Sequence, residues 1–228
     1  MTSSAPPSAT EPEAPASCVA VWDRAVRLVH WLLAALIAFA WWTAEEELLD
    51  WHYRAGLLIL GLVVFRLVWG FVGSSTARFA SFVRGRRAIA AYLRGRSGFV
   101  LGHNPLGALS VLALLAMVSL ETALGLFASD EDGFLSGPLV GFVSEDLAET
   151  LTELHADLFD YLLILIGLHL AAIAFYLLFR RDNLIGPMVS GRRPAPPGTE
   201  PMVAAPASRA AVAALVAFAV VSGVWYAG

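Results

Sequence analysis

Five long apolar segments limit what this sequence can fold into. They cover about residues 26–43, 53–72, 105–127, 155–179 and 209–226. A helix needs roughly 20 apolar residues to cross a bilayer, and helices satisfy their own backbone hydrogen bonds in lipid. The 228-residue chain is 58% hydrophobic and 15% charged, with a mean hydropathy of +0.69, which argues against an ordinary soluble domain. We therefore expect an all-α membrane protein, in which the Ala- and Val-rich fifth segment is the weakest span.

The charged residues between these segments predict how the chain crosses the membrane. Arginines precede the first span, fill the 73–104 connection and follow the fourth span, whereas the other two connections carry mainly Asp and Glu. Positively charged loops stay on the cytoplasmic side. We expect a multi-pass protein with a cytoplasmic N-terminus and acidic loops on the extracytoplasmic side. Those loops could dock a positively charged electron-transfer protein, although a plain solvated surface explains them as well.

The regions outside the spans are predicted to be irregular. Residues 1–20 are polar and Pro-rich, so we expect a disordered cytoplasmic tail and no cleavable signal peptide. Residues 187–207 read as a Pro-rich linker between a 21–186 transmembrane domain and a C-terminal helix at 209–226. Cys18 is the single cysteine and no C-x-x-C-H motif is present, so any haem must be bound without thioether links.

Four histidines lie at matched depths in the spans, where ionisable groups are usually functional. His155 and His169 are fourteen residues apart on the fourth span. This spacing puts them roughly 21 Å apart in depth and within roughly 40° of the same helix face. His30 on the first span lies level with His169, and His52 at the start of the second lies level with His155. Two imidazole pairs from facing helices can each hold a b-type haem by both axial positions.

Each of these residues also has an interpretation that involves no haem. A single histidine in an apolar helix is more often a hydrogen-bonded core or interfacial residue. Zinc prefers four close ligands, which two separate pairs do not supply. Arg66 is fourteen residues after His52 and reaches the depth of the His30 pair, where it could bind a haem propionate. A snorkelling arginine at the cytoplasmic boundary is an equal alternative.

Six stretches carry a resemblance to a known family. They are "VWDRAVRLVHWLLA", "WHYRAGLLILGLVVFRLVWGFVG", "FVRGRRAIAAYLRG", "LGHNPLGAL", "LTELHADLFD" and "LHLAAIAFYLLFRRDNLIGPM", within about residues 21 to 190. The sequence resembles the bacterial cytochrome b561 family, which includes the b-type cytochrome subunit of membrane-bound nickel–iron hydrogenases.

The resemblance implies a fold, a cofactor and a set of residues. It implies a four-helix transmembrane bundle in the bacterial inner membrane that holds two non-covalent b haems. The family's ligands fall on His30, His52, His155 and His169, paired His30 with His169 and His52 with His155, and its arginine falls on Arg66.

Two further residues are candidates for a site. His103 lies in "GHNP" before the third span, where Asn104 is a candidate helix N-cap and Pro105 a first helical residue. His103 could contact a quinone or a propionate, or be a plain interfacial histidine. Glu121 lies inside the third span, so it should be protonated or partnered. It could relay protons in quinol chemistry or bond near the outer haem, or be a neutral acid bonded to nearby backbone or to Thr122.

The sequence therefore predicts an integral membrane dihaem cytochrome. It would pass electrons between the quinone pool and a hydrogenase-like or other redox protein on the extracytoplasmic side. One alternative is a haem-containing anchor subunit of a redox complex, and another is a histidine-lined proton-coupled transporter. Such a chain could itself be a quinone oxidoreductase or a subunit of one, and it could form a homodimer. We expect contact with membrane lipid and none with nucleic acid.

Overall fold

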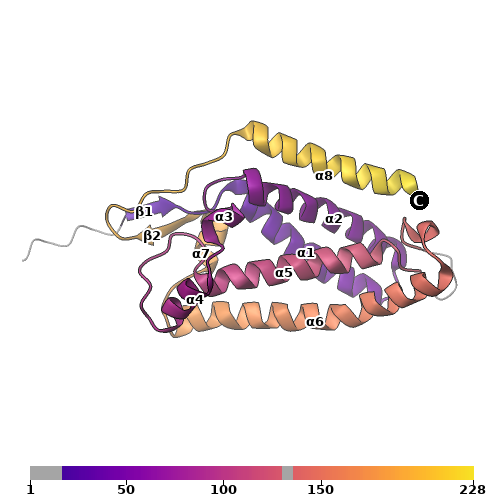
Figure 1. Cartoon of the computed structure of the whole chain (residues 1–228), viewed down its shortest axis with the longest axis horizontal. Coiled ribbons are helices and arrows are strands. Elements are labelled where there is room, and N and C mark those ends of the chain that lie inside the picture. The colour runs from indigo at the N-terminus through magenta and orange to yellow at the C-terminus, as the bar shows by residue number, and fades with distance from the viewer. Residues whose placement is uncertain (1–16, 130–135) are drawn as a thin grey trace, which may run out of the picture.

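Five long helices make up most of the chain, as the sequence predicted (Figure 1). The computed structural model describes residues 17–129 and 136–228. The long helices are α1 (Arg24–Glu45), α2 (Leu49–Val72), α5 (Pro105–Gly125), α6 (Glu145–Leu178) and α8 (Ala207–Ala227). Each is long and apolar enough to cross a membrane. The all-α, five-span prediction is confirmed.

One helix is much longer than its apolar segment. The span expected from residue 155 begins ten residues earlier, because α6 starts at Glu145. The Ser144 side chain accepts a hydrogen bond from the Leu147 N–H, and Glu145 and Asp146 in the first turn suit the positive end of the helix dipole. This capped, polar start lets the helix begin before its apolar part.

Short elements close the two ends of the bundle. At one end are β1 (Ser17–Ala20), α3 (Phe79–Phe82), α4 (Arg86–Leu93), α7 (Ile185–Ser190) and β2 (Arg192–Ala195), and at the other is the 3-10 helix η1 (Val140–Phe142) (Figure 1). β1 and β2 pair antiparallel, with Cys18 opposite Pro194. Residues 17–20 were expected in the irregular tail, and β2 lies in the expected 187–207 linker. Both form regular structure because the two strands pair with each other. Residues 1–16 and the acidic residues 130–132 lie outside the described part of the chain.

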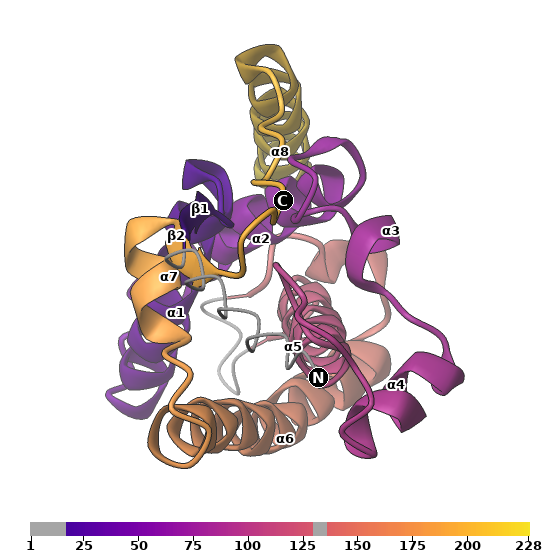
Figure 2. The ribbon, with the colours of Figure 1, turned by 90° about the vertical axis from the view of Figure 1, so that its left-hand side faces the viewer.

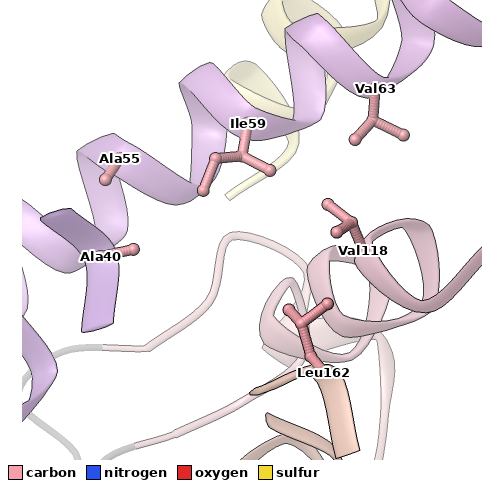
Figure 3. Close-up of a cluster of buried hydrophobic side chains, with 6 residues drawn as sticks. All are labelled: Ala40, Ala55, Ile59, Val63, Val118 and Leu162. Atoms are coloured by element: carbon pink, nitrogen blue, oxygen red, sulfur yellow. The ribbon is translucent and has the colours of Figure 1, made fainter. Parts of the chain in front are cut away.

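A buried apolar cluster joins the helices α1, α2, α5 and α6. α1 packs on α2, α5 on α6, and α2 on α5. Figure 3 shows their shared cluster, formed by Ala40, Ala55, Ile59, Val63, Val118 and Leu162. Small residues such as Ala40 and Ala55 allow close backbone approach, which is how helices pack in lipid.

Helix α8 lies outside this bundle, against α2 (Figure 2). Ala213 is fully buried in a cluster with Val26 and Trp69, and a Cβ added at Gly61 would lie 3.3 Å from a Val221 methyl carbon. The opposite face of α8 exposes large apolar side chains such as Phe218, as a lipid-facing surface does. The four preceding spans thus form a bundle that the fifth helix covers on one side.

The two ends of the bundle differ in charge. We call the end with α3, α4, α7 and the strands the arginine end, because it carries the arginines of the 73–104 connection and those after α6. The other end, formed by the α1–α2 turn, η1 and the start of α6, is the acidic end. Its acidic residues include Glu45, Glu46, Asp50 and Glu145.

Candidate cofactor-binding site

The four histidines of the spans come together as two pairs. His30 on α1 faces His169 on α6 with ring centroids 6.5 Å apart, and His52 on α2 faces His155 on α6 at 6.0 Å. A metal held between two imidazoles has a bond of about 2 Å on each side and about 1 Å more to each ring centre, so the centroids stand roughly 6 Å apart. Both pairs have this separation.

A short turn places His52 in its pair. Only residues 46–48 separate α1 from α2, and the Leu48 N–H donates to the Thr43 carbonyl at 2.8 Å. His52 therefore lies in the first turn of α2, beside the end of α1. Its Nδ1 lies 2.9 Å from the carbonyl oxygen of Ala40.

Hydrogen bonds orient three of the four rings. Besides the bond of His52, the Nδ1 of His155 lies 3.0 Å from the Glu121 carbonyl oxygen, and the Nδ1 of His169 lies 3.3 Å from the Ser110 hydroxyl. When Nδ1 carries the proton and donates it, Nε2 keeps the lone pair that a metal needs. His30 differs, because its buried Nδ1 has no hydrogen-bond partner among the described residues.

The backbone leaves room beside the rings. α1 and α6 do not pack closely on each other within the described residues. A Cβ added at the partly buried Gly56, four residues after His52, would meet no heavy atom within 4 Å. At Gly125 a Cβ would lie 3.0 Å from Cε1 of His155, so this glycine leaves the space that the ring occupies. The histidine pairs and the space near them therefore fit a flat, axially ligated ring such as haem.

Arg66 lies at the arginine end and forms no salt bridge within the described residues, although the Asp23 carboxylate interacts with it electrostatically. The residue is 8% exposed, its guanidinium carbon lies 5.4 Å from the Phe79 ring centroid, and its Nη1 is buried with no hydrogen-bond partner in the described chain. A buried charged donor left unpaired is costly. A carboxylate of a bound ligand, such as a haem propionate, would satisfy it.

His103 lies beside Arg66 in an aromatic setting. Its ring centroid is 4.6 Å from that of Trp22 and 4.8 Å from that of Phe82, and its Nδ1 is buried without a partner in the part of the chain that is described. Burial lowers the pKa of His103 to about 3, and the nearby Arg66 charge acts in the same direction. His103 is therefore a neutral imidazole at ordinary pH.

Helix α5 begins as the "GHNP" motif predicted. The Asn104 side chain accepts a hydrogen bond from the Gly107 N–H at 2.8 Å, and Pro105 is the first helical residue. Asn104 also donates to the Tyr176 hydroxyl at 3.1 Å, which ties the start of α5 to the end of α6. The motif thus fixes α5 against α6 and holds His103 just before the helix.

Glu121 contacts the acidic-end pair, which is His52 and His155. Its Oε1 lies 3.2 Å from Nδ1 of His155, and its buried Oε2 has no partner among residues 17–129 and 136–228. Thr122 instead donates to the carbonyl of Val118, so it is not the partner of Glu121. Sequence reasoning missed Ser110, although its place eleven residues before Glu121 puts it on the same face of α5.

A bundle of spanning helices with histidines paired across its interior is the architecture of a membrane cytochrome. The family model for prokaryotic cytochrome b561 matches residues 21–191, which is 171 of the 228 residues. This chain belongs to the prokaryotic cytochrome b561 family and is a multi-pass membrane b-type cytochrome, which implies electron transfer. No curated protein and no solved structure matches the chain. The match ends before β2 and α8.

Proposed function

We propose that this cytochrome binds two b haems, one between His30 and His169 and one between His52 and His155. The observation that supports this most directly is the centroid separation of 6.5 and 6.0 Å in two pairs from facing helices. When bound, haem iron supplies reversible one-electron chemistry. The chain's own part is to hold each imidazole in place and to neutralise the ligand's acid groups.

Arg66 and His103 are proposed to bind a propionate of the haem at the arginine end. Both side chains have buried nitrogen atoms without partners among the described residues, and His103 interacts electrostatically with Arg66, His30 and His169. A propionate offers two oxygen acceptors and a negative charge to the guanidinium. His103 as a quinone contact is the alternative role for this residue.

The two sites together are proposed to connect the two membrane surfaces. His155 and His169 lie on the unbroken helix α6, roughly 21 Å apart along its axis. We place the arginine end and the N-terminus in the cytoplasm, because positively charged loops remain there. Electrons would pass between the quinone pool and a redox protein at the acidic end, where a positively charged partner would be attracted.

Haem content tests the two-site proposal. The purified full-length chain should show about two b haems by pyridine haemochrome, and His30→Ala and His52→Ala should each retain about one. Ser119→Ala is the matched control, because its hydroxyl donates only to the Leu115 carbonyl of its own helix. A wild-type chain with one haem, or single variants that lose both, would contradict two independent sites.

The quinone proposal needs a separate measurement. In proteoliposomes, a quinol should reduce the haems of the wild-type chain, and the reduced haems should then pass electrons to a positively charged acceptor protein added outside. Salt should slow the second step if the acidic end attracts that protein. Haems that no quinol can reduce would favour the alternative of an anchor subunit, and co-purification of a catalytic subunit would support that alternative.

A further inference from the structure

Helix α5 supplies none of the proposed ligands, yet it touches both histidines of α6. The Ser110 hydroxyl lies 3.3 Å from Nδ1 of His169, and Glu121 Oε1 lies 3.2 Å from Nδ1 of His155. The two α5 residues are eleven positions apart, or about three helical turns, so they lie on one face of the helix. α5 thus places one polar side chain behind each α6 imidazole.

The two contacts differ in chemistry. Glu121 offers His155 two oxygen atoms, its backbone carbonyl at 3.0 Å and its carboxyl oxygen at 3.2 Å. Ser110 offers His169 a single neutral hydroxyl at the longer distance of 3.3 Å. The remaining two histidines repeat this contrast, because Nδ1 of His52 has the Ala40 carbonyl and Nδ1 of His30 has no partner among the residues described.

A hydrogen-bond acceptor behind a ligating imidazole changes the reduction potential of the metal that the imidazole binds. An oxygen that accepts a hydrogen bond from Nδ1–H makes the imidazole a stronger electron donor to the metal, and a stronger donor favours the higher oxidation state. The acidic-end pair therefore favours ferric iron. At the other end the acceptors are weaker and Arg66 adds a buried positive charge, which favours the reduced state.

We propose that Glu121 is a positioning residue that acts through His155 to hold the acidic-end haem at a lower reduction potential than the arginine-end haem. Ser110 acts in the same way, but more weakly, through His169. This inference rests on the two proposed haem sites. An electron that enters at the acidic end would then move downhill toward the arginine end.

A potentiometric titration of the full-length, haem-loaded protein tests the role of Glu121. Glu121→Gln should raise the midpoint potential of the acidic-end haem and leave the other unchanged. We expect about a tenfold change in the ratio of ferrous to ferric haem at a fixed potential, which corresponds to about 59 mV for one electron. Glu121→Asp shortens the side chain by one methylene and moves the carboxyl away from His155. It should also raise the midpoint potential of the acidic-end haem, and it replaces the Gln variant if that variant folds poorly.

Controls separate this effect from a general disturbance of α5. Thr122→Val changes the next residue, whose hydroxyl bonds only within its helix, and should move neither midpoint. Ser110→Ala should raise only the arginine-end midpoint, and by less. The His52→Ala background, which keeps the arginine-end haem alone, assigns the midpoints. The low-spin ferric EPR signal of the acidic-end haem should also change in Glu121→Gln.

The possible failures are distinguishable. Two haems per chain with unchanged midpoints and EPR signals in both Glu121 variants would overturn the inference, as would equal shifts of both haems. A haem count other than two in the wild-type chain would instead overturn the proposed function on which the inference depends.

Discussion

The two histidine pairs have the same separation but different surroundings. At the acidic end, Nδ1 of His52 and Nδ1 of His155 both have backbone carbonyl partners. At the arginine end, His30, Arg66 and His103 each keep a buried nitrogen without a partner in the described chain. The polypeptide alone completes the first set of hydrogen bonds. The second set needs acceptors that the described side chains do not provide.

Unsatisfied buried polar atoms are expensive. The buried nitrogen atoms without a partner in the described chain gather at the arginine end, whereas the acidic end has only the Oε2 of Glu121. Four side chains keep such a nitrogen, namely Arg27, His30, Arg66 and His103, and His103 interacts electrostatically with Arg66 and His30. An acidic ligand group placed among them would relieve the cost. The difference between the ends therefore suggests that ligand carboxylates contribute more to binding at the arginine end, and packing and backbone bonds more at the acidic end.

The largest effect on haem content should come from a side chain that fills the space occupied by the His155 ring. A Cβ at Gly125 would already lie 3.0 Å from the His155 ring, so Gly125→Val should displace this imidazole and remove the acidic-end haem. Haem per chain should fall from about two to about one. Gly223→Val is the control, because a Cβ at Gly223 meets no heavy atom within 4 Å. Two retained haems in Gly125→Val would mean that His155 does not need its observed position.

Loss of the Arg66 charge should weaken only the arginine-end haem. Arg66→Gln removes a charge-assisted bond to a propionate, worth about 2 kcal/mol, which is roughly thirtyfold in haem affinity. Haem release to an excess of an apo-haem protein would measure this for each site. Arg54→Gln, an exposed arginine over the Trp51 ring, is the control and should release haem as the wild type does. Equal release from both sites would show that Arg66 stabilises the bundle rather than one ligand.

Removal of α8 should leave both pairs intact. The helix packs on the outside of α2 through Ala213 and Ala217 and lies beyond the family-matched residues. A chain that ends at Pro206 should keep about two haems, with a melting temperature lower by a few degrees because α2 loses packing. Thermal melts followed by the haem absorption would measure this. Loss of either haem would make α8 part of the site instead of a cover.

The sequence predicted the bundle and both pairs because the relevant signals are local. Apolar length indicates spans, and a fourteen-residue spacing on a straight helix fixes both depth and face, as for His155 and His169. The extended start of α6, the pairing of β1 with β2 and the contact of Ser110 with His169 were not predicted. The start of α6 depends on a helix cap that lies before the apolar segment. The strand pairing and the Ser110 contact depend on which distant segments meet in the fold, as Cys18 and Pro194 do.

The smallest expected effect concerns His103. His103→Phe keeps an aromatic ring between Trp22 and Phe82 but removes the buried Nδ1. If this nitrogen bonds the same propionate as Arg66, the variant should lose about 1 kcal/mol of haem affinity, roughly fivefold, at the arginine end alone.

The pH dependence makes this prediction sharper. Because the pKa of His103 is lowered to about 3, the imidazole stays neutral from about pH 5 to 9, and no charge is lost in the variant. The ratio of haem release rates between His103→Phe and the wild type should therefore be constant over this range. A ratio that approaches one as the pH rises through 6 to 7 would mean that a charged His103 holds the ligand. That result would imply that a bound carboxylate raises the pKa of this imidazole, and the arginine end would then bind its ligand through two positive charges instead of one.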